Sequence, residues 1–92
     1  MDVAEDVRDR LVETSITEHI KEGIIDYAKK YGLDGMKIID KYSCEIIDKA
    51  KELSKKFLNG PMTFDELEDE EMEYIFEILK KEREGHGQGL DS

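Results

Sequence analysis

The chain has 92 residues with 24 acidic and 14 basic side chains, which gives a formal net charge of −10 at pH 7. That length accommodates one domain, and one cysteine with two histidines excludes both an internal disulfide and a structural zinc site. The acidic start and the lack of an apolar run of roughly 18 residues exclude a signal peptide and a membrane span, so we expect a reduced, cytoplasmic protein.

Two helices, or one bent helix, are expected in the first third of the chain. The first is predicted over 2–13, where apolar residues recur every four positions: Val3, Val7 and Leu11. Ser15 and Glu18 fit a capping box, so a second helix is predicted over 16–31. Gly32 follows it in the position that glycine commonly occupies beyond a helix end.

The next helix carries the strongest periodic signal in the chain. Asp34 is a favourable N-cap for it. Its broad apolar face consists of Met36, Ile39, Tyr42, Ile46, Ile47, Ala50, Leu53 and Phe57. Ser43 is a candidate cap for a second segment, and the sequence leaves open whether the helix is interrupted there. Residues 59–61 end the helix with Asn-Gly-Pro.

The last helix has the clearest start. Thr63 and Glu66 fit a capping box, and Met62 and Leu67 occupy the positions of a hydrophobic staple. Its apolar residues spread over more than half of the circumference, which indicates contacts on two sides. We therefore predict an all-α fold, a small antiparallel bundle of about four helices over 1–84, followed by a flexible, disordered Gly-rich tail over 85–92.

The negative charge is concentrated near the start of the last helix. Residues 1–60 hold 13 acidic and 11 basic side chains, whereas residues 61–92 hold 11 and 3. Seven of the nine positions in 65–73 are acidic, and we call them the acidic cluster: Asp65, Glu66, Glu68, Asp69, Glu70, Glu71 and Glu73. The acidic balance disfavours nucleic-acid or membrane binding, which require a basic surface.

The acidic cluster admits three interpretations. The first interpretation is a solvated face, favoured by the helix dipole and partly neutralised by Lys55 and Lys56 across a short loop. The second is a docking surface for a partner protein with a basic surface, in the extreme case a mimic of nucleic acid. The third is a divalent-cation site, although the spacing of an EF-hand is absent. The functional hypothesis is a small, non-enzymatic interaction module (adaptor, regulator or inhibitor) that docks through this cluster.

Ile25, Ile38 and Ile47 lie at or beyond the edges of the apolar stripes and are candidates for a second, apolar contact with a partner. Either the core wraps around a central last helix, or a second chain completes an apolar patch. We favour the second explanation, a homodimer.

The alternative function is a helix-turn-helix nucleic-acid-binding regulator formed by residues 24–42. Ala28, Gly32 and Asp34 match the small residue, the turn glycine and the start of the next helix. Such a regulator requires one exposed face with four lysines: Lys29, Lys30, Lys37 and Lys41.

No constellation of catalytic residues or cofactor motif is recognisable. His19 has Glu18 and Glu22 nearby but lacks the Glu three residues before it that a bundle di-metal site requires, so we expect a surface or half-exposed residue. Cys44 is expected to be half-buried and inert, because a nucleophilic cysteine needs a base held beside it. We predict no catalytic residue, no cofactor and no metal.

Overall fold

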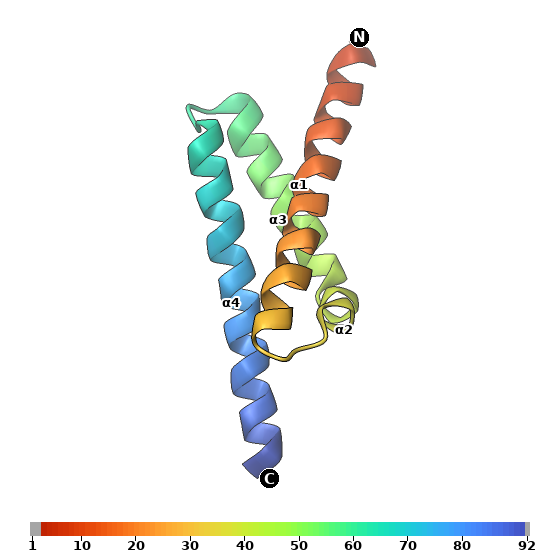
Figure 1. Ribbon diagram of the computed structural model, residues 1–92. Coiled ribbons are helices and arrows are strands. Elements are labelled where there is room, and N and C mark those ends of the chain that lie inside the picture. The colour runs from red at the N-terminus through yellow and green to blue at the C-terminus, as the bar shows by residue number, and fades with distance from the viewer. Residues whose placement is uncertain (1–2, 92) are drawn as a thin grey trace.

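The computed structural model describes the backbone of residues 3–91 and the side chains of residues 7–84. It is all-α, with helices α1 (Val3–Lys30), α2 (Gly35–Lys41), α3 (Ser43–Asn59) and α4 (Phe64–Asp91). Helices α1 and α4 run in the same direction and α3 runs antiparallel to both, while α2 lies across the end at which α1 stops (Figure 1). The predicted small antiparallel helical bundle is confirmed.

Helix α1 is continuous, so the predicted break at Ser15 is wrong. Ser15 is exposed and lies inside the helix. The hydroxyl of Thr17 donates to the Glu13 carbonyl oxygen of the preceding turn at 2.9 Å, a bond that fits an unbroken helix. A cap at Ser15 would interrupt the backbone hydrogen bonds of a segment without glycine or proline, and nothing in the packing compensates for that loss.

The turn between α1 and α2 follows the sequence prediction closely. Gly32 has φ of +70°, the left-handed conformation that glycine adopts without steric cost. The Leu33 amide donates to the Ala28 carbonyl at 2.9 Å, which closes the helix end as in a Schellman motif. The Asp34 carboxylate then accepts from the Met36 and Lys37 amides at 3.1 and 3.4 Å and caps α2.

The structure has an interruption next to Ser43, a point that the sequence left open. Tyr42 separates α2 from α3 with φ −105° and ψ 16°, outside the helical region. Its amide donates to the Ile38 carbonyl and its carbonyl accepts from the Ile46 amide, so both helix ends are closed by the backbone. Ser43 is the first residue of α3, and no side chain caps this helix.

The start of α4 forms the predicted capping box. The Glu66 amide donates to Thr63 Oγ1 at 3.2 Å, and the Thr63 amide donates to Glu66 Oε1 at 3.3 Å. The backbone of α4 continues to Asp91, into the range of the predicted Gly-rich tail. The side chains of 85–92 lie outside the described residues, so the tail stays a prediction.

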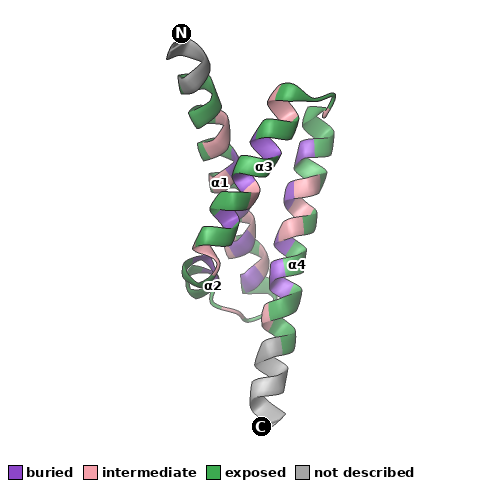
Figure 2. Ribbon diagram, turned by 180° about the vertical axis from the view of Figure 1, so that it is seen from behind, coloured by how far each residue is buried: buried purple, intermediate pink, exposed green. Residues whose placement is uncertain are grey.

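The core is centred on α1, not on the last helix as one of our explanations had it. Helix α1 packs against each of the other three helices and buries a residue at every fourth position: Ile16, Ile20, Ile24 and Ala28. The buried sides of α1, α3 and α4 face one another (Figure 2). The largest buried partners come from α3 and α4: Ile46, Leu53, Ile75, Ile78 and Leu79.

Candidate functional site

The acidic cluster lies on the first three turns of α4, but its members do not share one face. Five of them are exposed: Asp65, Glu66, Glu68, Asp69 and Glu73. Glu70 is half-buried, and Glu71 is buried with 6% of its surface exposed. Because successive residues point about 100° apart around a helix, one of seven clustered acids must face the bundle. Glu71 therefore lies apart from the exposed surface that the other members form, on the side of α4 that faces the bundle.

The lysines expected to neutralise the acidic cluster do not form ion pairs with it. Lys56 lies 3.7 Å from Glu52, and Lys49 lies 3.0 Å from the same carboxylate. The hydrogen bond from Lys49, together with the charges of Lys49 and Lys56, lowers the pKa of Glu52. Among the described side chains, no lysine or arginine forms an ion pair with any member of the acidic cluster.

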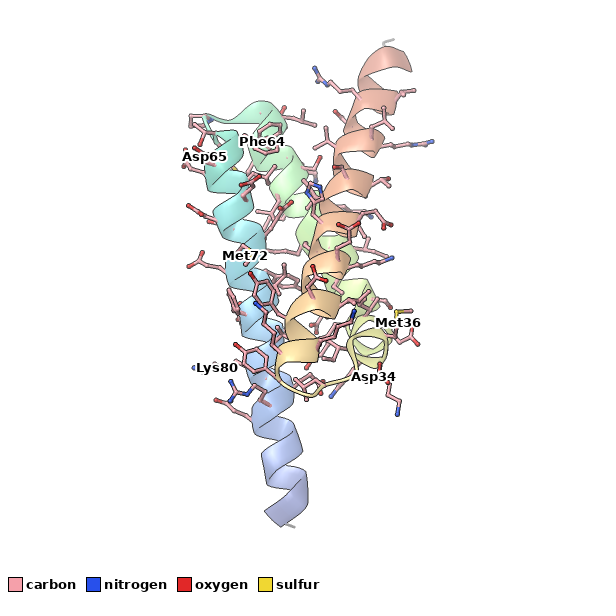
Figure 3. All side chains as sticks on the ribbon, in the orientation of Figure 1. Asp34, Met36, Phe64, Asp65, Met72 and Lys80 are labelled. Carbon is pink, nitrogen blue, oxygen red and sulfur yellow. The ribbon has the colours of Figure 1, made fainter. Side chains whose placement is uncertain are left out.

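An apolar groove opens beside the acidic cluster, between the middle of α1 and the corner that joins α3 to α4. We call it the corner groove. It encloses about 220 Å³ and its apolar walls come from three helices: Leu11, Val12, Ile16, Phe57, Phe64 and Leu67. Figure 3 shows Phe64 at the top of α4, near that corner, while α1 leans away from it towards its N-terminus. The exposed fractions of Leu11 and Phe64 are 65% and 58%.

Glu71 and His19 meet in this groove. His19 Nδ1 lies 3.7 Å from Glu71 Oε1, and 51% of the histidine side chain is exposed, as predicted for His19. The second carboxylate oxygen, Oε2, is buried and accepts no hydrogen bond. Burial raises the pKa of Glu71 and outweighs the opposing effect of His19, because water solvates the ionised form better than the groove does.

The three isoleucines predicted to contact a partner have different environments. Ile38 is buried, with 4% of its surface exposed, so its predicted contact with a partner is wrong. Ile25 is half-buried beneath α2, where a Cβ on Gly35 would come within 2.9 Å of its Cα. Only Ile47 is exposed, at 44%. The helices α1 and α2 approach closely through Gly35, which explains why Ile25 is covered.

The segment proposed as a helix-turn-helix ends in a short second helix. Helix α2 has 7 residues and α3 follows after one residue. All four lysines of the alternative function are exposed, but Lys41 Nζ lies 2.8 Å from Glu82 Oε1 and Lys30 Nζ lies 4.7 Å from the centre of the Tyr27 ring. No specific observation favours this alternative, and it stays a prediction.

The remaining reactive side chains are not brought together. Cys44 is exposed, not half-buried as expected, because it lies in the first turn of α3, on the outer side of that helix. His19 lines the corner groove together with Phe57 of α3. Phe57 lies about 20 Å along α3 from Cys44, at a rise of about 1.5 Å per residue, so His19 is not beside the thiol. Burial is the main cause that raises the pKa of the Tyr74 hydroxyl to about 12, so this phenol stays protonated near neutral pH.

Two kinds of feature are absent from the part of the chain that the structure describes. No group of three or more histidine, cysteine, aspartate or glutamate side chains in this part of the chain has an arrangement that could hold a metal ion. None of its helices combines the length and the apolar character needed to cross a membrane.

The corner groove was not predicted from the sequence, although two signals pointed to it. The apolar stripe of α1 continues from Ile16, the first core residue of the helix, towards the N-terminus at Leu11 and Val7, and these two side chains are exposed. Glu71 lies four residues after Leu67 and four before Ile75, both of which are buried. That spacing places Glu71 on the inner side of α4.

No family model, no curated protein and no solved structure matches this chain.

Proposed function

We propose that this protein is a small, non-enzymatic interaction module that docks a partner protein with a basic surface through the acidic cluster of α4. The observation that carries this proposal is the absence of a lysine or arginine ion pair to any cluster member among the described side chains. Among the described side chains, the exposed acids therefore have no ion pair within the chain that would compete with a partner. Such a surface steers an oppositely charged partner into place and disfavours other proteins.

The stability of α4 does not account for this arrangement. The helix dipole favours acids only in the first turn, so Glu70 and Glu73 gain little from it. The cluster also places like charges four residues apart at Asp65 and Asp69, Glu66 and Glu70, and Asp69 and Glu73. Each such pair destabilises a helix by about 0.2–0.5 kcal/mol. A lysine at position 69, 70 or 73 would replace such a repulsion with an attraction, so the uniform negative charge supports a role in recognition.

Capture from the native cell lysate tests this proposal. The tagged full chain is incubated with lysate, with and without nuclease, at low and at high salt, and retained proteins are identified by mass spectrometry. We expect a basic protein that is retained after nuclease treatment and released at high salt. High salt reduces the distance over which exposed charges attract one another to less than about 10 Å.

Two results would contradict the proposal. Loss of every retained protein after nuclease treatment would favour the helix-turn-helix alternative over residues 24–42. Retention of this chain alone would indicate self-association in place of docking.

A further inference from the structure

The corner groove brings exposed apolar side chains from different helices together in one place. Leu11, with 65% of its surface exposed, and Phe64, with 58%, line its opposite walls. Single exposed apolar residues are normal on protein surfaces, whereas apolar residues gathered on both walls of a groove mark a contact site. Its volume of about 220 Å³ is below the roughly 300–1,000 Å³ of small-molecule pockets. It therefore fits the side chains of another chain better than a whole metabolite.

The acidic side of the groove indicates the charge of its occupant. The Glu71 side chain is 7% exposed and its Oε2 atom accepts no hydrogen bond, while the exposed Glu68 lies one turn before it in the same groove. An apolar residue of similar size at position 71 would avoid the loss of hydration that a buried carboxylate suffers. A carboxylate is favoured there if a donor or a cation from a bound partner reaches it.

We infer that the corner groove binds an amphipathic helix of the partner, with apolar side chains between Leu11 and Phe64 and a lysine or arginine directed to Glu68 and Glu71. This inference rests on the proposed docking function and names the part of the partner that is recognised. A helix fits because grooves between helices accept side chains spaced three or four residues apart. A second copy fits less well, because each copy carries a net charge of −10.

A synthetic peptide provides the probe. It is a helix of about 15 residues, close to the length at which isolated helices become stable, with leucines on one face and lysines beside them. Binding is followed by amide NMR spectra of the full isotope-labelled chain. We expect shifts concentrated at the groove, at Leu11, His19, Phe57 and Phe64. Two control peptides either replace the flanking lysines with glutamates or scramble the leucines, and both should bind at least about tenfold more weakly.

Matched variants locate the binding site. Leu11→Glu should weaken binding of the lysine peptide about tenfold or more, since it places a charge in the apolar wall. Ile47→Glu makes the same change at an exposed residue, 44% exposed, outside the groove and should leave binding unchanged. Both positions are exposed, so both variants should fold, which their circular dichroism spectra will verify. Glu71→Gln should also weaken binding, because a neutral amide no longer attracts the peptide's lysine.

Several results would overturn the inference: no binding of the lysine peptide, equal binding of the glutamate peptide, shifts outside the groove, or equal effects of Leu11→Glu and Ile47→Glu. Shifts at the groove that depend on protein concentration alone would identify a second copy as its occupant. If a basic partner is captured from lysate but Leu11→Glu leaves that capture unchanged, the docking function stands and the groove is not its site.

Discussion

Glu71 is the residue at which stability and recognition conflict most clearly. It occupies an inward position of α4, four residues from each of the buried Leu67 and Ile75. Its carboxylate has one histidine nearby, at 3.7 Å, and an oxygen without a hydrogen-bond donor. Buried ionised groups without full compensation lower stability and tend to be retained where function needs them. The helical spacing could have revealed this residue, but a run of seven acids conceals which member faces inward.

The raised pKa of Glu71 predicts a pH-dependent effect of Glu71→Gln on stability. Because burial raises the folded-state pKa above the ordinary value of 4.5, the stability that this group contributes is complete below about 4.5 and is lost as the pH rises through the folded-state pKa. A glutamine at position 71 does not ionise, so the variant does not lose stability in this way as the pH rises. The free energy of unfolding of the variant, relative to the wild type, should therefore increase between about pH 4.5 and neutral pH, as measured by urea unfolding at several pH values.

The exposed Glu73→Gln on the same helix is the control, since it removes an equal charge from solvent. A difference between Glu71→Gln and the wild type that stays constant or decreases over that pH range would show that the Glu71 carboxylate is not destabilised by burial.

At the scale of the helices, the same sequence pattern led to one correct and one wrong prediction. Thr63 with Glu66 forms a reciprocal capping box, whereas Ser15 with Glu18 lies inside the continuous α1. The difference lies in what precedes each pattern. Asn59, Gly60 and Pro61 stop α3 before Thr63, while helix-compatible residues precede Ser15. A cap motif therefore predicts a helix start only where the preceding residues end the previous helix.

Substitution of the two hydroxyl residues tests this distinction. Thr63→Ala should lower the free energy of unfolding by about 1 kcal/mol, because the first turn of α4 loses the hydroxyl that accepts the Glu66 amide hydrogen. Ser15→Ala should leave stability unchanged or raise it by a few tenths of a kcal/mol, since alanine is the better helix former. Thermal and urea unfolding measure both. A cost of about 1 kcal/mol or more for Ser15→Ala would contradict a continuous α1.

Helix α1 has two parts with different roles. From Ile16 onward it carries the core, and before Ile16 it exposes Val7 and Leu11. Ile20→Ala should lower the free energy of unfolding by about 2–5 kcal/mol, because Ile20 is completely buried. Leu11→Ala should change it by less than about 0.5 kcal/mol, as measured by urea unfolding. A large loss of stability for Leu11→Ala would show that this residue belongs to the core and not to a contact site.

At the scale of the whole molecule, apolar periodicity and local turn residues were sufficient to predict the all-α bundle and the turn at Gly32, and they left the interruption next to Ser43 open. These features depend on local geometry and on residues a few positions apart. Periodicity was not sufficient to place α1 at the centre or to reveal the corner groove. Both depend on how helices far apart in the sequence approach one another, for example where Gly35 lets α2 approach Ile25.

The distribution of charge over the molecule is the basis of the proposed function, so charge reversal tests it most directly. The binding affinity of the basic protein captured from lysate is compared for two triple variants. One variant reverses cluster residues: Glu68→Lys, Asp69→Lys and Glu70→Lys. The control reverses three exposed acids of α1 at four-residue spacing: Glu18→Lys, Glu22→Lys and Asp26→Lys.

Both variants change the net charge equally, so only the position of the charge differs. We predict that the cluster variant loses binding at low salt by at least about tenfold while the α1 variant retains it. Equal binding by both variants, or an equal loss in both, would show that the acidic cluster of α4 is solvated surface and not a docking site.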